Sequence, residues 1–327
     1  MTIRADHHTH IFSPAAVARI ERFGREFAPA TATQLVRVLD EDGVDRALVL
    51  SVAYFFGMPD AGDPDPGAMA AENDWTADQV AQYPDRLAVC CSVNPLLPGA
   101  GLEIERCAST GRFVGLKLHL ANSDVDLRDP DHVRRLGEVF ERANAARLMI
   151  AIHMRTRRPD YGATDARALI DQVLPKAPDV TVQIAHGAGW GGYDPATDQA
   201  LAAFATWAAG NRAAAGRVYF DVALSPLDDQ PDPPAEDAPD DGESAAAWRD
   251  HRFDSLAADL RAIGLDRVLF ATDWPVTTPR AYLGALERRL PLQPAEFDQL
   301  RNSVAPWLGR RDDEHGARAG LEGRTDV

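Results

Sequence analysis

Three histidines and an aspartate lie within five consecutive positions near the start of the chain, in the stretch DHHTHIF that begins at Asp6. Side chains alternate across a β-strand, so Asp6, His8 and His10 would share one face while His7 points the other way. Two imidazoles on one face can bind one cation together. The spacing therefore predicts His8 and His10 as metal ligands, and His7 as a partly buried residue with a local hydrogen bond.

Three later segments run apolar up to a single polar residue. LMIAIHM, VTVQIAHGAGW and RVLFATDWP reach His153, His186 and Asp273, respectively. A polar side chain at an inward position is costly unless it is paired or binds a metal. Any one of these histidines alone could be a satisfied core residue, but three nitrogen ligands and one carboxylate together suit Zn²⁺, Mn²⁺ or Fe²⁺.

Eight short β-rich runs must position these side chains, with helical patterns such as DHVRRLGEVFERANAA between them. The predicted strands are Ile3–His10, Arg46–Ala53, Leu87–Val93, Val114–Leu120, Leu148–His153, Val180–His186, Val218–Leu224 and Val268–Asp273. This alternation predicts an α/β fold, a (β/α)8 TIM barrel. An open doubly wound sheet is the alternative, but no GxGxxG follows the first run, so a dinucleotide fold has little support.

Candidate ligands gather where a barrel places its active site, at the carboxyl ends of the strands. Five of the eight predicted strands carry such a residue near this end. Lys117 and His119 add to the set on the fourth strand. His119 lies about 7 Å further along the strand than Lys117, so we expect it at the rim as a substrate-contacting or supporting group.

No linker or internal repeat divides the chain, so we expect a single barrel domain over residues 1–308 and a polar, disordered tail over 309–327. An acidic, proline-rich insertion over 226–250 follows the seventh strand. Its stretch DDQPDPPAEDAPDDGE holds eight acidic residues, four prolines and no basic residue, and cannot bury enough apolar surface to order itself. It is either a disordered surface insertion or, given its position, a mobile lid over the catalytic face.

Composition excludes several classes of partner. The 327 residues carry a formal net charge of −16, which argues against nucleic acid and anionic membranes. No apolar run approaches the ~18 residues of a membrane span, and nothing resembles a signal peptide. The cysteines form neither a CxxC motif nor a disulfide framework, so we expect a reducing, cytoplasmic location; they are Cys90, Cys91 and Cys107.

At this point the chain resembles the amidohydrolase superfamily, and specifically its amidohydrolase-related branch. The resemblance extends from the first strand to Trp307 and is carried by DHHTHIF, ENDWTADQVAQYPDRLAVCCSVNP, GRFVGLKLH, IAIHM, IAHGAGW and ATDWP. It implies a distorted (β/α)8 barrel that binds one or two divalent metal ions. From the ligand types we expect zinc, with manganese or iron as alternatives. Members mostly hydrolyse C–N, C–O or P–O bonds, and some decarboxylate aromatic acids or hydrate double bonds.

The resemblance also implies roles for individual residues. His8, His10 and His153 match metal ligands, and His186 matches the position on the sixth strand. Asp273 matches an aspartate that binds metal and handles the proton of the attacking water. Lys117 falls where some members carry a carboxylated lysine that bridges two metals.

Lys117 leaves two metal counts open. With a carboxylated Lys117, all six residues form a binuclear site; they are His8, His10, Lys117, His153, His186 and Asp273. Without it, His8, His10, His153 and Asp273 hold one metal, and His186 is free to stabilise an oxyanion. A third possibility is that Lys117 is an inward lysine paired with a carboxylate.

Two loops on the catalytic face could contact substrate. HMRTRRPDYG supplies Arg155, Arg157 and Arg158, which either clamp an anionic group or belong to a solvated basic loop. HGAGWGGYDP supplies Trp190 and Tyr193, which either stack on a ring or belong to a flexible turn.

Together these patterns predict a metal-dependent hydrolase acting on a small, anionic ester, lactone or amide. The alternative is a non-oxidative, metal-dependent decarboxylase of an aromatic or unsaturated acid, which a single metal and a free His186 would suit. A non-catalytic metal-binding protein is the third hypothesis. The expected partner is a small molecule, and a homo-oligomer is compatible with the sequence.

Overall fold

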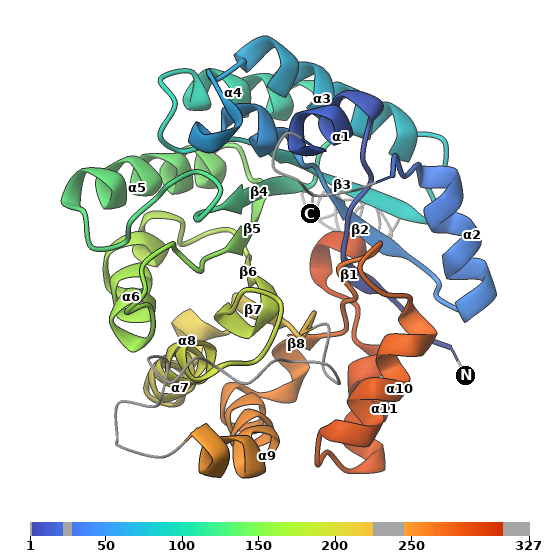
Figure 1. Ribbon diagram of the computed structural model, residues 1–327, viewed down its shortest axis with the longest axis vertical. Helices are drawn as coiled ribbons and strands as arrows, with labels where there is room; N and C mark the ends of the chain where they lie inside the picture. The colour runs from blue at the N-terminus through green and yellow to red at the C-terminus, as the bar shows by residue number, and fades with distance from the viewer. Residues whose placement is uncertain (1, 22–27, 225–244, 310–327) are drawn as a thin grey trace, which may run out of the picture.

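The computed structural model of the protein describes residues 2–21, 28–224 and 245–309. Eight strands are joined in chain order, and each neighbouring pair is parallel. They are β1 (Asp6–Thr9), β2 (Ala47–Leu50), β3 (Leu87–Ser92), β4 (Gly115–His119), β5 (Met149–His153), β6 (Val182–Ile184), β7 (Val218–Asp221) and β8 (Val268–Leu269). Helices surround them as an outer ring (Figure 1). The predicted (β/α)8 barrel is confirmed.

Backbone hydrogen bonds join the first and last strands. The amide of His7 donates to the carbonyl of Phe270 at 3.0 Å, and the amide of Asp273 donates to the carbonyl of His8 at 2.9 Å. These bonds place the segment after β8 directly beside β1. β1 and the segment after β8 lie far apart in the sequence, but they bring their candidate ligands to the same place.

The helices follow the strands as the sequence predicts. They are α1 (Pro14–Glu21), α2 (Ala32–Asp42), α3 (Pro66–Val80), α4 (Ala100–Thr110), α5 (Pro130–Ala145), α6 (Ala163–Ala168), α7 (Pro195–Gly210), α8 (Arg212–Ala215), α9 (Ala245–Ile263), α10 (Pro279–Arg289) and α11 (Pro294–Asn302). Three of them, α3, α5 and α7, begin with an Asp-Pro pair. The aspartate side chain accepts a free amide of the first turn, and proline lacks the amide that would be unpaired there.

The barrel separates an outer core from a small inner one. Outward side chains such as Leu116 and Ile150 pack against the helices in the larger cluster. Inside, a second cluster fills the lower barrel with Leu48, Leu50, Cys90, Met149 and others. Gly115 lies beside this cluster, where an added Cβ would come within 2.5 Å of Met149. Apolar side chains therefore fill one end of the barrel interior, and polar side chains occupy the other end, where the strands finish.

Seven of the eight strands end one to four residues earlier than predicted, and two of these differences move a candidate ligand into a turn. β6 stops at Ile184 and β8 at Leu269, so His186 and Asp273 lie in turns beyond them. Both residues adopt a left-handed backbone, with φ values of 56° and 59°. Period-two alternation cannot predict these side-chain directions, because the chain has left the extended conformation.

The structure corrects the expectation about the cysteines at one pair. Cys91 on β3 and Cys107 on α4 form a disulfide, with their Cα atoms 6.4 Å apart. Cys91 faces outward and Cys107 lies on the buried side of α4, so the fold brings together two residues 16 positions apart. Cys90 points into the barrel and is a free, buried thiol.

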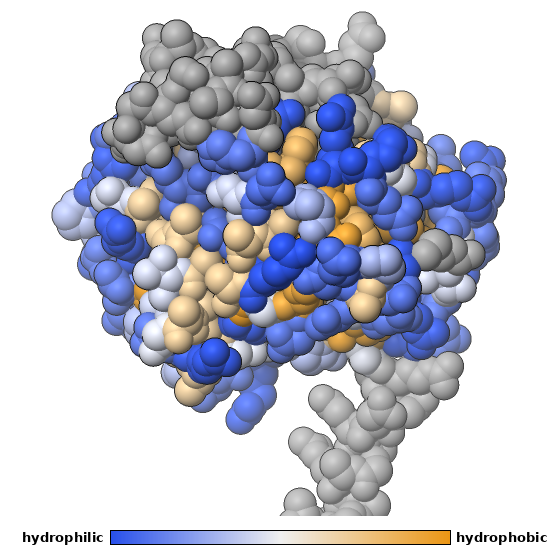
Figure 2. Space-filling view, turned by 90° about the horizontal axis from the view of Figure 1, so that it is seen from below, coloured by the Kyte–Doolittle hydropathy of each residue, from blue (hydrophilic) through white to orange (hydrophobic). Residues whose placement is uncertain are grey.

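The surface carries few large apolar side chains in the part of the chain that is described. Figure 2 shows one face, where hydrophilic residues surround a pale hydrophobic patch. Four large hydrophobic residues are exposed, namely Leu102, Trp190, Val276 and Val304. No described helix is long and apolar enough to cross a membrane. Most of the predicted insertion 226–250 and nearly all of the tail 309–327 lie outside the described residues.

Candidate metal centre

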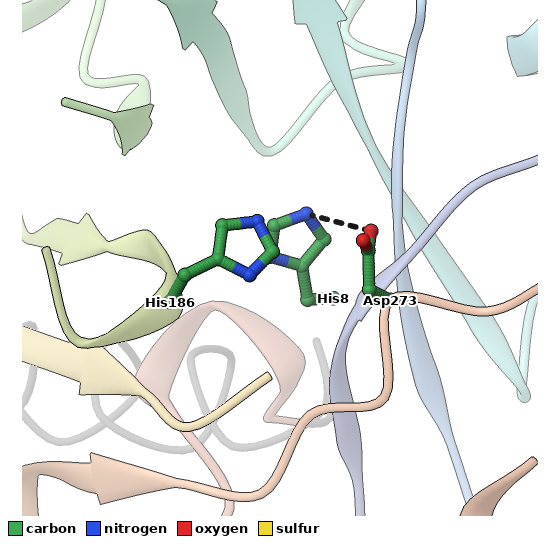
Figure 3. Close-up of side chains that lie close together, drawn as sticks. All are labelled: His8, His186 and Asp273. Carbon is green, nitrogen blue, oxygen red and sulfur yellow. Dashed lines mark ion pairs between the residues drawn. The ribbon is translucent and has the colours of Figure 1, made fainter. Parts of the chain in front are cut away.

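Side chains from the first strand and from the segment after the last strand converge on one point. The Nε2 atoms of His8 and His10 lie 3.2 Å apart. Asp273 Oδ1 lies 3.5 Å from His8 Nε2 and 3.3 Å from His10 Nε2. His186 joins this group, since His8, His186 and Asp273 each offer a ligand atom within 4.8 Å of the others (Figure 3). A metal ion bound here would have three nitrogens and a carboxylate around it.

The remote nitrogens of these three rings are already occupied. Each Nδ1 contacts a hydrogen-bond acceptor: His8 contacts Asp221 at 3.0 Å, His10 the carbonyl of Leu50 at 2.7 Å, and His186 the carbonyl of Ala223 at 2.6 Å. Nδ1 must therefore carry the proton in the neutral ring, which leaves a lone pair on each Nε2. The Nε2 lone pairs of His8 and His10 lie 3.2 Å apart and repel each other unless a cation or a proton lies between them. This arrangement fits a metal ion.

Burial supports the neutral state of the ligand candidates. Burial and the neighbouring Lys117 lower the pKa of His8 to about 3. Burial alone would raise the pKa of Asp273, but the neighbouring rings of His10, His8 and His186 lower it below its usual range. Neutral imidazoles and an ionised carboxylate are the forms that bind metal.

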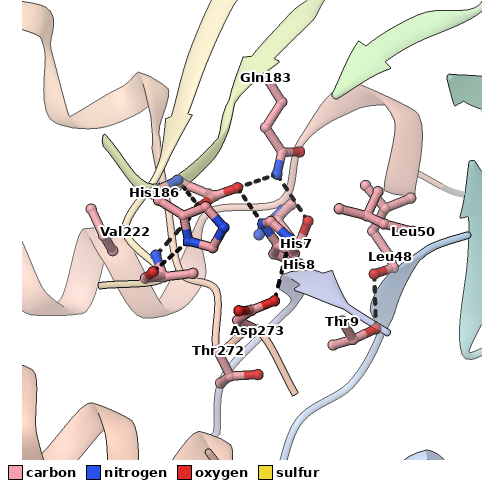
Figure 4. Close-up of polar contacts among 12 residues, drawn as sticks. His7, His8, Thr9, Leu48, Leu50, Gln183, His186, Val222, Thr272 and Asp273 are labelled. Atoms are coloured by element: carbon pink, nitrogen blue, oxygen red, sulfur yellow. Dashed lines mark hydrogen bonds and ion pairs between the residues drawn. The ribbon is translucent and has the colours of Figure 1, made fainter. Parts of the chain in front are cut away.

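Asp221, at the end of β7, lies behind the candidate ligands and fixes their positions. It was not predicted from the sequence as a site residue. Its carboxylate accepts four hydrogen bonds, from His8 Nδ1 at 3.0 Å, Gln183 Nε2 at 2.7 Å, and the amides of His186 at 2.8 Å and Ala223 at 3.3 Å. Three of these partners, His8, Gln183 and His186, are labelled in Figure 4. Burial opposes its charge, but these partners hold its pKa below the usual range. The signal was present in VYFD, where Asp221 alternates with the outward side chains of Val218 and Phe220 and therefore faces the inside of the barrel.

Asp6 fixes the turn that presents Asp273. It accepts hydrogen bonds from Thr272 Oγ1 at 2.6 Å, from the Thr272 amide at 3.1 Å and from the His8 amide at 3.2 Å. Burial raises its pKa to about 7 despite these bonds. His7 points away from the site, as predicted, but its bonds are not local: Nδ1 donates to the carbonyl of Phe270 at 3.0 Å, and Nε2 accepts from the amide of Ala305 at 3.1 Å.

His119 and His153 stack against each other, because β4 and β5 pair them in register. Their ring centroids are 3.9 Å apart and the planes differ by 10°. His119 Nδ1 accepts the amide of Asn122 at 3.3 Å, so its Nε2 carries the proton and is a donor. His153 Nδ1 is buried and has no hydrogen-bond partner among the described residues, and its ring centroid is 5.0 Å from that of His186. A bound cation would satisfy this nitrogen.

Lys117 reaches the ligand cluster from β4. Its amine Nζ lies 3.3 Å from His8 Nε2, and the side chain is buried. Burial lowers its pKa to about 8, although Asp221 and Asp273 oppose this effect. The amine therefore lies within the cluster of candidate ligands.

A cavity of about 580 Å³ opens above these residues. All six candidate metal ligands line it, together with His119, Trp190 and Arg157. Its upper wall is largely apolar and aromatic, made by Phe12, Ile20, Tyr54, Phe55, Met58 and Val276. Trp190 is 47% exposed and stands edge-on to His119 and His153.

Two of the predicted substrate-binding residues do not line the cavity. Arg155 Nη1 contacts both oxygens of Asp194 at 2.8 Å, and its guanidinium lies 5.0 Å from the centre of the Tyr161 ring. Tyr193 is buried and donates its hydroxyl to Asp198 at 2.6 Å. Neither residue has a free polar group directed at the cavity, because helix α7 supplies a partner for each.

We expect Arg155→Ala to affect stability more than substrate affinity. The change removes a partly buried pair that holds Asp194 at the start of α7, and should cost about 1–2 kcal/mol of unfolding free energy. Thermal unfolding followed by circular dichroism should show a lower Tm, while KM for an anionic substrate stays within about twofold. A KM increase of ten times or more at unchanged Tm would instead place Arg155 in the substrate site.

Comparison with known proteins follows the geometry. A family model described as Amidohydrolase matches residues 5–301. Solved structures with the same fold include a zinc-bound amidohydrolase from Burkholderia multivorans, at 17% identity over 92% of this chain and 96% of that chain, with a TM-score of 0.53.

Two further structures are similar. A probable 2-pyrone-4,6-dicarboxylic acid hydrolase from Acinetobacter baumannii with citric acid bound is 18% identical, covers 92% of this chain and 97% of that chain, and has a TM-score of 0.56. A dihydroxybenzoic acid decarboxylase from a Polaromonas species with manganese and 2-nitroresorcinol is 16% identical, covers 92% and 94%, and has a TM-score of 0.58. No curated protein sequence matches the chain.

Proposed function

Because this chain belongs to the amidohydrolase family, we propose that it is a metal-dependent hydrolase of a small, anionic ester, lactone or amide. One observation carries the proposal. The unprotonated Nε2 atoms of His8 and His10 lie 3.2 Å apart and within 3.5 Å of an Asp273 oxygen. A protein gains nothing in stability from buried lone pairs that face each other, so the arrangement favours a bound cation.

The residues present fit one or two divalent ions. His8, His10, His186 and Asp273 would hold the first, and the orphaned His153 together with a carboxylated Lys117 would complete a binuclear set. The position of His186 close to His8 and Asp273 favours its role as a ligand. We expect zinc, with manganese or iron as alternatives. A divalent cation here would acidify water and polarise a substrate carbonyl at neutral pH.

Asp273 is the proposed proton acceptor. Its carboxylate is ionised and its side chain is 23% exposed towards the cavity. It would take the proton of the attacking water and return it to the leaving group, since the same carboxylate lines the cavity that the substrate would occupy. The left-handed backbone at this residue, pinned by Asp6 and Thr272, keeps the carboxylate in place.

His119 would bind substrate rather than metal. Its Nδ1 is taken by a backbone amide, and its Nε2–H is therefore a hydrogen-bond donor on the cavity wall. Burial lowers its pKa well below the usual value, so the ring stays neutral. It would donate to a substrate oxygen, while Trp190 and Arg157 contact the rest of the molecule.

Decarboxylation is the second candidate, and the cavity wall favours it. Tyr54, Phe55 and Trp190 form aromatic surfaces suited to a planar ring. The Polaromonas decarboxylase, which has manganese and a nitroresorcinol bound, has the same fold. A non-catalytic metal-binding protein is the third hypothesis and is dismissed by turnover of any substrate.

The test is a paired assay on the purified protein. Anionic aryl esters and lactones are followed for hydrolysis, and aromatic acids for CO₂ release, before and after removal of metal with a chelator. We expect hydrolysis that disappears with the metal and returns when Zn²⁺ or Mn²⁺ is added. Metal-dependent CO₂ release without hydrolysis would select the second candidate, and turnover that persists without metal would refute both.

The partner proposed here is thus a small molecule. Neither nucleic acid nor a membrane is proposed as a partner, given the net charge of −16. A cytoplasmic location stays a prediction, and the Cys91–Cys107 disulfide is a feature more typical of oxidising compartments.

A further inference from the structure

An ion pair crosses the mouth of the cavity between two loops that start from non-adjacent strands. Asp60 lies in the short 3-10 turn Pro59–Ala61 after β2, and Arg157 lies in the loop after β5. Arg157 Nη1 pairs with Asp60 Oδ2, and both side chains line the cavity. Since β3 and β4 separate the two strands, the pair connects different sides of the barrel mouth.

Arg157 is the one loop arginine with both access to the cavity and a weak partner. Its Nε donates to the carbonyl of Ala121 at 2.7 Å, which anchors the guanidinium at the rim. The side chains of Arg157 and Asp60 are 38% and 54% exposed, so their attraction is screened by water. By contrast, Arg155 is 16% exposed and contacts both oxygens of Asp194.

Arg158 differs in another way. It is shared between Asp126 and Asp160, with bonds of 3.0 Å and 2.9 Å, and does not line the cavity. Displacing two acidic partners for one ligand is unfavourable. An incoming anion can therefore reach only Arg157 among the three, and only by competing with one exposed carboxylate.

We propose that Asp60 is a specificity-determining residue that occupies the anion-binding group of Arg157 until a substrate anion replaces it. The proposal rests on the proposed function, because it assigns an acidic group to the substrate of the same cavity. A substrate carboxylate held inside the cavity is less screened than the exposed Asp60 and forms the stronger pair. A neutral ligand leaves the Asp60–Arg157 pair intact and gains nothing from Arg157.

The exchange is tested by binding rather than turnover. Calorimetric titration of the full-length protein with benzoate and with benzamide compares an anion and a neutral molecule of the same shape. Asp60→Asn should tighten benzoate binding roughly three- to tenfold and leave benzamide within twofold. Asp63→Asn is the matched control: it removes a charge from the same exposed loop without touching Arg157, and should change both affinities less than twofold.

A double variant separates exchange from general charge effects. Arg157→Gln should weaken benzoate roughly tenfold, and Asp60→Asn in that background should add nothing. The proposal is overturned if Asp63→Asn tightens benzoate as much as Asp60→Asn, if the double variant keeps the gain, or if neither protein binds benzoate at millimolar concentration. If Asp60→Asn tightens benzoate binding as expected but the protein shows no metal-dependent turnover, only the proposed hydrolysis is refuted.

Discussion

Replacing Asp273 with asparagine should lower kcat by roughly 10²–10⁴, the range for loss of a positioned general base. The amide keeps an oxygen near His8 and His10, which the carboxylate approaches at 3.5 and 3.3 Å, but it cannot accept a proton. Metal content should fall much less than activity. The measurement is kcat for the hydrolysed substrate, taken together with metal analysis of the same sample.

Asp126→Asn provides the matched control. Asp126 is a partly exposed acid on the same side of the barrel that pairs with Arg158 at 3.0 Å and does not line the cavity. Its loss should leave kcat within about threefold, as expected for a surface pair. If Asp273→Asn keeps a tenth or more of the wild-type kcat at full metal content, another group accepts the proton.

Asp221→Asn should weaken metal binding by roughly 10- to 100-fold, as loss of a buried partner of a metal-binding histidine does elsewhere. Asp221 accepts the proton-bearing Nδ1 of His8 at 3.0 Å and three other donors. Asparagine offers one acceptor oxygen and presents an NH₂ group to at least one donor. His8 can then shift its proton to Nε2, which removes the lone pair that would bind the metal.

Competition with a chromogenic chelator measures this affinity at a temperature where both proteins are folded. Gln183→Leu is the control, since Gln183 donates to Asp221 at 2.7 Å without contacting a ligand ring. Gln183→Leu should change the metal affinity by a few-fold at most. An Asp221→Asn protein that is less stable yet binds metal as tightly as the wild type would show that Asp221 serves the fold and not the metal centre.

The sequence was sufficient to predict the barrel and the ligand face. Eight apolar runs of strand length, each followed by a helix pattern, admit few other folds, and the observed strand order confirms the prediction. The shared face of His8 and His10 followed from alternation alone. The turns at His186 and Asp273 did not, because their positive φ values arise from contacts with Asp221 and Asp6 that are distant in sequence.

Other features depended on partners that spacing does not reveal. Arg155 and Tyr193 have the right loops and the right chemistry, but Asp194 and Asp198 occupy their polar groups. Arg157, two positions further along, pairs with the exposed Asp60 and lines the cavity. Which arginine of a basic loop faces a cavity is decided by helix capping and packing nearby.

Metal analysis of the purified wild-type protein tests the central claim most directly. Samples exposed to Zn²⁺, Mn²⁺ or Fe²⁺ and then desalted are measured for bound metal per chain. The arrangement of His8, His10, His186 and Asp273 predicts one equivalent of tightly bound divalent metal, or two if Lys117 is carboxylated, and His10→Ala should lose it. A wild-type protein that retains none of the three metals would contradict the account.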